Sequence, residues 1–130
     1  MKSLFTKTTV AVAATFAVAA ISLPTSDVYA ASVRVKCEKQ ANRSKVSVDG
    51  RGLAAGSYTA HIISGDNNET SAALSGAGEI EFDFDSDAGN IAAGATAIDS
   101  TFIQGGKVIG QIVDSKGHTV TQATAICRAK

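Results

Sequence analysis

The segment from Glu79 to Asp87 constrains the fold of this chain more than any other stretch. Acidic side chains at every second position from residue 79 to 85 alternate with the large apolar residues Ile80, Phe82 and Phe84. Successive side chains of a strand point to opposite faces, so strict alternation is typical of a strand with one buried face and one face in water. The segment therefore predicts a central amphipathic β-strand with three large apolar side chains in the core.

Further short alternating segments follow one another along the chain, separated by Gly, Asn and Asp residues that favour turns. The clearest strand candidates are 32–38, 45–49, 57–64, 107–114 and 119–128, with weaker ones at 70–75 and 101–104. Turns are expected at 49–52 and 76–78, while 91–98 fits either a short helix or a strand. The pattern predicts an all-β protein, an immunoglobulin-like antiparallel β-sandwich of about seven to eight strands.

Two hairpins are expected within this set. The first joins 32–38 to 45–49 across a polar loop. In the second, Lys116 and Gly117 would form a two-residue tip, which fixes the register of the flanking strands. This register puts one set of residues on the same face: Val108, Gly110, Ile112, Thr121, Ala123, Ala125 and Cys127.

Residues 1–30 have the features of a secretory signal peptide. Two lysines precede an apolar run over 10–23, and this run is shorter than the ~20 residues that a membrane-spanning helix needs. We expect cleavage between Ala30 and Ala31, so that the chain is exported and is periplasmic or secreted. The remaining residues 31–130 are then a single β-sandwich domain with no membrane span.

The charge balance argues against a nucleic-acid-binding protein. The full chain has 12 basic and 12 acidic residues. Lys2, Lys7 and Asp27 precede the expected cleavage site, so ten basic and eleven acidic residues remain and the net charge is −1. General nucleic-acid binders need a basic surface, which this composition does not supply.

The two cysteines, Cys37 and Cys127, both follow the signal segment. An even number of cysteines in a small exported domain is typical of disulfide bonding. We therefore predict a disulfide between Cys37 and Cys127, which joins the first strand candidate to the last.

Two short segments resemble pieces of known sandwich proteins. Residues 110–117, with the sequence GQIVDSKG, resemble a hairpin common in bacterial immunoglobulin-like and prealbumin-like sandwiches, and LAAGSY at 53–58 resembles a second piece seen there. The two segments cover fourteen residues and occur in the reverse of the order expected for the prealbumin-like group. The resemblance implies a sandwich fold and assigns no family.

The acidic strand is also the best candidate for a metal site. Asp83, Asp85 and Asp87 have the one-three-five spacing of calcium loops, and carboxylate oxygens are suitable Ca²⁺ ligands. The helical calcium loop also requires Gly at its sixth position and Glu at its twelfth, where this chain has Ala88 and Gly94. A looser site would use the three aspartates with the backbone carbonyl of Asn90. The alternative is a solvated acidic face that discourages edge pairing.

No catalytic constellation is apparent. His61 and His118 are the only histidines, and the sequence has no nucleophile-elbow, zinc-protease, phosphate-loop or dinucleotide motif. We therefore expect a protein that is not an enzyme and has no cofactor other than a possible calcium ion.

The sequence predicts instead a non-enzymatic binding or structural module. Its partner would be a protein or another component of the cell envelope, which the sequence does not identify. The expected contact surface is either the loops at the ends of the sandwich or the acidic face, which carries Glu79, Glu81, Asp83 and Asp85. The alternative function is divalent-cation binding at Asp83–Asp87.

Overall fold

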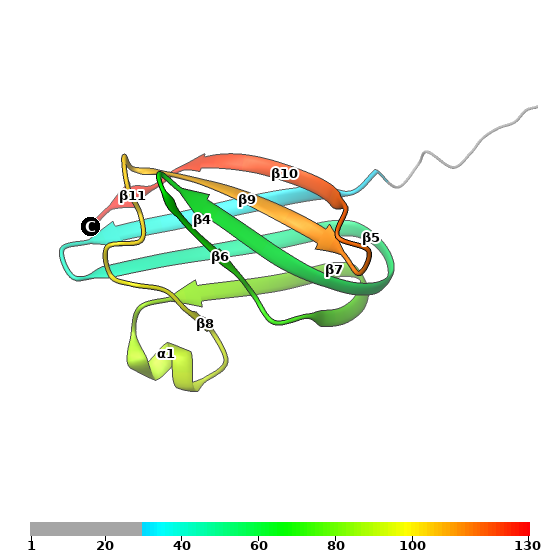
Figure 1. Cartoon of the computed structure of the whole chain (residues 1–130), viewed down its shortest axis with the longest axis horizontal. Coiled ribbons are helices and arrows are strands. Elements are labelled where there is room, and N and C mark those ends of the chain that lie inside the picture. The colour runs from blue at the N-terminus through cyan, green and yellow to red at the C-terminus, as the bar shows by residue number, and fades with distance from the viewer. Residues whose placement is uncertain (1–29) are drawn as a thin grey trace, which may run out of the picture. The chain divides into compact units, whose positions relative to one another are not determined.

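The long strand β5 (Arg43–Ser64) organises the sheet. The computed structural model describes residues 30–130, and Figure 1 shows how the other strands lie around this one. The remaining strands are β4 (Ser32–Gln40), β6 (Asn67–Thr70), β7 (Leu74–Asp85), β8 (Thr96–Ala97), β9 (Lys107–Asp114), β10 (Thr119–Ile126) and β11 (Arg128–Ala129). Hydrogen bonds join all eight strands into one sheet, and the one helix of the described part, α1 (Ala88–Ala92), has five residues. The predicted all-β class is confirmed.

Strand β5 pairs with β4, β6, β7 and β9, and it bends between its two halves. Its register with β7 shifts between Gly50 and Leu53 and again between Leu53 and Gly56. Such bulges bend a strand and increase its twist. The half before the bend pairs with β4 and the half after it pairs with β9. Because β4 also contacts β9 and β10 without being paired to them, the sheet is folded over at this bend.

Two of the expected turns are therefore wrong. Residues 49–52 and 76–78 lie inside β5 and β7, which pair with each other across the bend. The glycines that suggested turns lie at or beside the bulges instead. Gly52 and Gly78 have positive φ angles of 67° and 79°, a backbone conformation that favours glycine. Neither of the two weaker strand candidates forms the predicted strand. The first, 70–75, is interrupted at residues 71–73, which separate β6 from β7. The second, 101–104, contributes only an isolated bridge from Gln104 to Lys107.

The core lies between the two halves of the folded sheet. The predicted inward residues of the acidic strand are buried: Ile80 is 7 % exposed, Phe82 2 % and Phe84 0 %. The other fully buried apolar residues come from both halves of β5 and from β9, namely Val46, Val48, Ala60, Ile62, Val108 and Ile112.

Both predicted hairpins form. Strand β4 pairs with the first half of β5, and β9 pairs with β10. The opposite residues of the second hairpin are those that the sequence predicted to share a face: Val108 with Ala125, Gly110 with Ala123 and Ile112 with Thr121. The predicted two-residue tip is wrong, because the Asp114 amide donates to the His118 carbonyl over 2.9 Å and encloses three residues. A register shift between Thr119 and Thr121 then restores the expected pairing.

The predicted disulfide is confirmed. Cys37 on β4 and Cys127, just after β10, are bonded, with their Cα atoms 4.6 Å apart. The bond lies where β4 and β10 contact each other without pairing, so it closes this side of the folded sheet.

Residues Ala31–Lys130 form one compact unit, and β4 begins at Ser32, directly after the expected cleavage site. The predicted signal features before Ala30 lie outside the described residues. Within the described part, no helix has both the length and the apolar character needed to cross a bilayer.

Candidate functional site

The outer face of β4, β5 and β7 carries three cross-strand rows of polar side chains. Across β7, β5 and β4, the first row is Asp83, Ser47 and Lys36, the second is Asp85, Lys45 and Glu38, and the third is Glu81, Asp49 and Arg34. On its paired side, the acidic strand thus lies next to β5 and, beyond it, β4, and both of these strands carry basic residues. The outward-facing acidic side chains of β7 therefore share this face with basic, acidic and hydroxyl side chains of β5 and β4.

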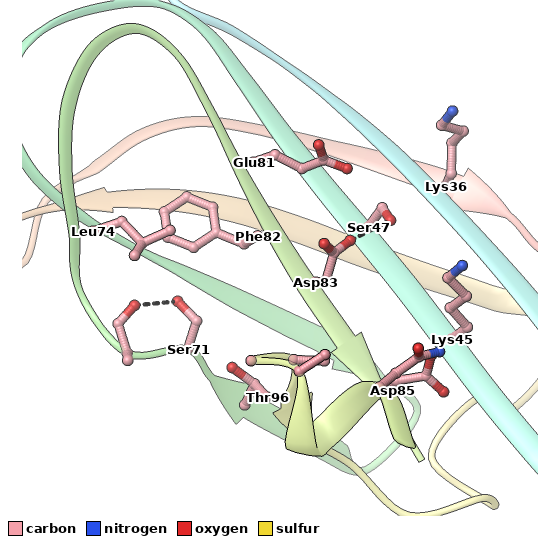
Figure 2. Close-up of a pocket in the computed structure, with 15 residues that line it drawn as sticks. Lys36, Lys45, Ser47, Ser71, Leu74, Glu81, Phe82, Asp83, Asp85 and Thr96 are labelled. Carbon is pink, nitrogen blue, oxygen red and sulfur yellow. Dashed lines mark hydrogen bonds between the residues drawn. The ribbon is translucent and has the colours of Figure 1, made fainter. Parts of the chain in front are cut away.

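A groove of about 600 Å³ runs over this face and around β7. On one side of β7, Glu81 and Asp83 point toward Ser47 and the two lysines of the groove, as Figure 2 shows. On the other side the groove is bounded by Leu74, Phe82 and the residues that lead into β8. The groove therefore combines a charged wall with an apolar one. Its lining residues are Lys36, Lys45, Ser47, Ser71, Ala72, Leu74, Glu81, Phe82, Asp83, Asp85, Asn90, Ala93, Gly94, Ala95 and Thr96.

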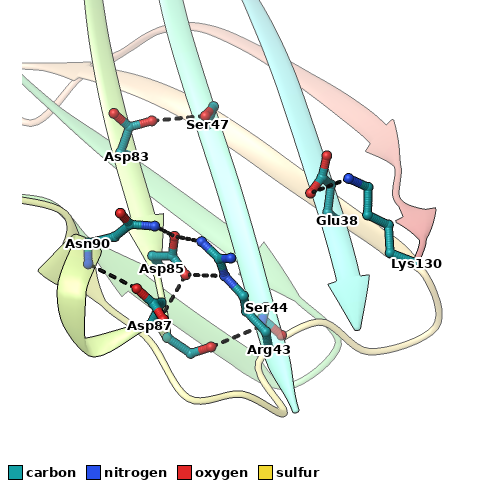
Figure 3. Close-up of polar contacts among 10 residues, drawn as sticks. Glu38, Arg43, Ser44, Ser47, Asp83, Asp85, Asp87, Asn90 and Lys130 are labelled. Carbon is teal, nitrogen blue, oxygen red and sulfur yellow. Dashed lines mark hydrogen bonds and ion pairs between the residues drawn. The ribbon is translucent and has the colours of Figure 1, made fainter. Parts of the chain in front are cut away.

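At the end of the groove, Asp85 is the centre of a buried polar network (Figure 3). Its side chain is 2 % exposed. Arg43 donates two hydrogen bonds to it, from Nε to Oδ1 over 3.0 Å and from Nη2 to Oδ2 over 2.7 Å. Asn90 Nδ2 and the backbone amide of Asp87 donate to the same carboxylate over 2.8 and 3.0 Å.

These donors stabilise the charged form of Asp85. The bidentate bond from Arg43 is the largest cause, and it holds the pKa of the Asp85 carboxyl well below its usual range, against the opposing effect of burial. Arg43 is 29 % exposed in its side chain and its own pKa is raised by the same bond. The network ties the start of β5 to the end of β7 and to α1.

The other two aspartates of the predicted calcium site have separate partners. Asp83 Oδ1 accepts a hydrogen bond from Ser47 Oγ over 2.9 Å. Asp87 is the N-cap of α1, where its Oδ2 accepts from the Asn90 amide over 3.1 Å. Between residues 30 and 130, no group of three or more His, Cys, Asp and Glu side chains is placed to hold a metal ion. The three aspartates follow one another along the chain, but the structure does not gather them around one point.

Three of the four acidic residues on the expected contact face are exposed to solvent. Glu79, Glu81 and Asp83 are exposed, but Asp85 is buried. The expectation that Asp85 forms part of an exposed surface is wrong, because Arg43 and Asn90 donate hydrogen bonds to it and enclose it.

Arg43 and Ser44 were expected in a polar loop and were not predicted to have a structural role, but they are the first two residues of β5. Ser44 is fully buried, and its Oγ donates to the Ser100 carbonyl over 2.7 Å. It also accepts from the Ile103 amide over 3.3 Å, so it holds the segment after β8 against the sheet. No local pattern marks either residue, since each finds its partner more than forty positions away.

The two histidines have different partners on different elements. His61 Nδ1 lies 3.1 Å from Gln111 Oε1 on the neighbouring strand β9. His118 lies at the tip of the β9–β10 hairpin, with its Nδ1 3.9 Å from Asp114 Oδ2. The pKa of Asp114 is lowered, chiefly because the backbone amide of His118 donates to its side chain. Neither histidine lines the groove.

Strand β7 has one edge that is largely unpaired in the described part of the chain. β5 pairs along one side of it, whereas on the other side only Phe84 and Asp85 have a strand neighbour, the two-residue β8. Edge strands expose backbone donors and acceptors that can pair with another chain. This open edge runs along the groove.

Comparison with models of known protein families gives no match, and comparison with curated proteins gives none either. The features of the described residues that point to a function are the groove and the open edge of β7.

Proposed function

We propose that this chain is a small exported binding module, not an enzyme, and that the groove around β7 is its contact surface. The observation that carries the proposal is the position of the groove, which places acidic side chains, an apolar wall and an open strand edge within one volume of about 600 Å³. Proteins built on rigid β-scaffolds commonly use loops and edge strands for binding. The Cys37–Cys127 bond is compatible with an oxidising compartment outside the cytosol.

We also propose that the folded sheet is an immunoglobulin-like sandwich. Two features support this assignment: the apolar residues on both halves of the folded sheet make one core, and the Tyr58 hydroxyl donates to the Ala54 carbonyl over 2.6 Å. A tyrosine that bonds to the backbone a few residues upstream recurs in sandwiches of this kind. Here it fixes the bend of β5.

A capture experiment from the envelope fraction of the source cell tests the binding proposal. The bait is the oxidised domain, and the test variant combines Glu81→Gln with Asp83→Asn on the groove. The matched control combines Asp66→Asn with Glu69→Gln, which changes the net charge equally in the turn before β6 and in β6 itself. We expect the groove variant to lose a partner that the wild type and the control both retain. Equal capture by all three proteins would show that the groove is not the contact surface.

Calcium binding at Asp83, Asp85 and Asp87 is the alternative function. It would require Asp85 to give up hydrogen bonds from Arg43, so we expect millimolar calcium to leave the melting midpoint unchanged. A ligand that binds only the native state must raise this midpoint. A rise that chelator reverses and Asp83→Asn abolishes would establish the calcium site instead.

A further inference from the structure

The open edge of β7 has backbone groups that point away from the sheet, and the hydrogen bonds identify which residues carry them. The Ile98 amide donates to the Asp85 carbonyl over 3.0 Å from the β8 side, whereas the Ser86 amide donates to the Ser44 carbonyl of β5 over 3.1 Å. Successive residues of a strand direct their backbone groups to opposite sides. The register between β5 and β7 is regular from residue 80 to 85, so the amides and carbonyls of Glu81 and Asp83 point outward beside the groove.

The side chains along this edge define what a paired strand would have to carry. On the outer face, Glu81 and Asp83 are exposed carboxylates that a neighbouring strand would meet at every second residue. On the inner side, the groove is bounded by Phe82 and by Leu74, which is 43 % exposed. Opposite charges directly across a strand pair stabilise it and like charges destabilise it. A strand that fits this edge therefore alternates basic with apolar residues.

The same chemistry disfavours a second copy of this chain as the occupant. If β7 paired with β7 of another molecule, the acidic rows of the two strands would face each other on one side of the joined sheet. The acidic row thus suppresses self-association through this edge, which is a common use of charge on edge strands. It leaves the edge open to a strand of opposite charge.

We propose that β7 binds a partner protein by strand addition, and that the partner supplies an extended segment in which Lys or Arg alternates with apolar residues. The backbone of this segment pairs with Glu81 and Asp83, its basic side chains meet the carboxylates, and its apolar side chains contact the exposed Leu74. The inference extends the proposed function, because it names the kind of partner that the groove takes.

A synthetic seven-residue peptide of alternating Lys and Val, labelled with fluorescein, is the probe. Its binding to the wild-type domain is measured by fluorescence anisotropy at low salt. Two control peptides have the same length: one replaces Lys by Glu, and one keeps every side chain but carries N-methyl groups on alternate backbone amides. We expect the N-methylated peptide to bind about tenfold more weakly, the effect of losing two backbone hydrogen bonds, and the Glu peptide not to bind.

Two variants of the domain test the same edge from the other side. Glu81→Pro removes the outward amide without removing a bond to β5, since proline is tolerated on the open side of an edge strand. Glu81→Gln removes the charge and keeps the amide. We expect the proline variant to bind about threefold more weakly than the glutamine variant, the effect of losing one backbone hydrogen bond. Circular dichroism checks that both variants are folded.

Amide hydrogen exchange on the wild-type domain gives a readout that needs no variant. When the peptide binds, the exchange rates of the Glu81 and Asp83 amide hydrogens should fall. The exchange rates of the Ile80 and Phe82 amides, which already pair with β5, should change little. Equal affinity for the plain and N-methylated peptides, or no slowing at Glu81 and Asp83, would overturn strand addition. If capture from the envelope still depends on the groove in that case, the proposed binding function stands and only its strand-addition mechanism fails.

Discussion

Replacing Asp85 by Asn is the sharpest test of how the end of the groove is held together. The substitution keeps the shape of the side chain but removes its charge. In either orientation of the asparagine, its NH2 group would face two donors, so at least two of the four hydrogen bonds to Asp85 are lost. The charge on Arg43 also loses its buried partner.

The size of the effect follows from the burial of the two partners. Removing one member of a fully buried ion pair costs ~3–5 kcal/mol. Asp85 is buried, but Arg43 is 29 % exposed, so water can replace part of what the arginine loses. We therefore expect a loss of about 2–3 kcal/mol in the free energy of unfolding. For a domain of this size the melting midpoint would fall by roughly 10–20 °C.

Urea and thermal denaturation followed by circular dichroism measure this change. Asp83→Asn is the matched control, because Asp83 is exposed and accepts one hydrogen bond, from Ser47; it should change stability by less than about 0.5 kcal/mol. If the free energy of unfolding of Asp85→Asn lies within about 0.5 kcal/mol of that of this control, the polar network around Asp85 does not stabilise the domain.

The stability difference should also depend on pH. The pKa of Asp85 is depressed in the folded state, so its contribution is fully present above its unfolded pKa of about 3.9 and is lost as the pH falls toward the folded value. The gap between wild type and Asp85→Asn should therefore be constant above about pH 5 and narrow below about pH 4. A gap that stays unchanged down to pH 2 would contradict the assignment of the stabilisation to the ionised carboxylate.

Three further predictions concern the rest of the domain. Replacing Cys37 and Cys127 together by Ser should lower the free energy of unfolding by about 4–5 kcal/mol, the chain-entropy value for a loop of this length, and urea denaturation of both proteins measures it. Gly110→Ala places a Cβ atom 2.6 Å from Val35 Cγ2 and should cost about 1–3 kcal/mol; adding Val35→Ala should restore part of the loss, and no rescue would mean that this contact is not the cause. Intact mass analysis of the protein isolated from the cell envelope should give a chain that begins at Ala31 with both thiols oxidised, and a full-length chain would contradict the cleavage prediction.

The parts of the fold that follow from local alternation could be predicted from the sequence. The buried row of Ile80, Phe82 and Phe84 and the register of the β9–β10 hairpin both depend on residues within one strand or two adjacent ones. Period-two patterns report which face is buried, and a short connection fixes which strands are neighbours.

The bend of β5 could not be predicted in this way. Gly50 and Gly52 suit a turn and a bulged strand equally well, and what decides is pairing with β7, more than twenty residues further on. Residues such as Arg43 were missed for a related reason. Its partner Asp85 is 42 positions away, and alternation does not give the order of strands in a sheet. The open edge of β7 likewise depends on strand order alone.

The position of the disulfide has a consequence for biosynthesis. Cys37 is on the first strand of the domain, and its partner Cys127 is 90 residues later, after the last long strand. Until Cys127 has been synthesised and β10 lies beside β4, Cys37 has no partner within its own chain. With only two cysteines there is also one possible intramolecular bond, so oxidation cannot produce a mispaired isomer. The oxidised state thus marks a chain that has been synthesised at least as far as Cys127, and a chain cut short before this residue keeps a free thiol at Cys37.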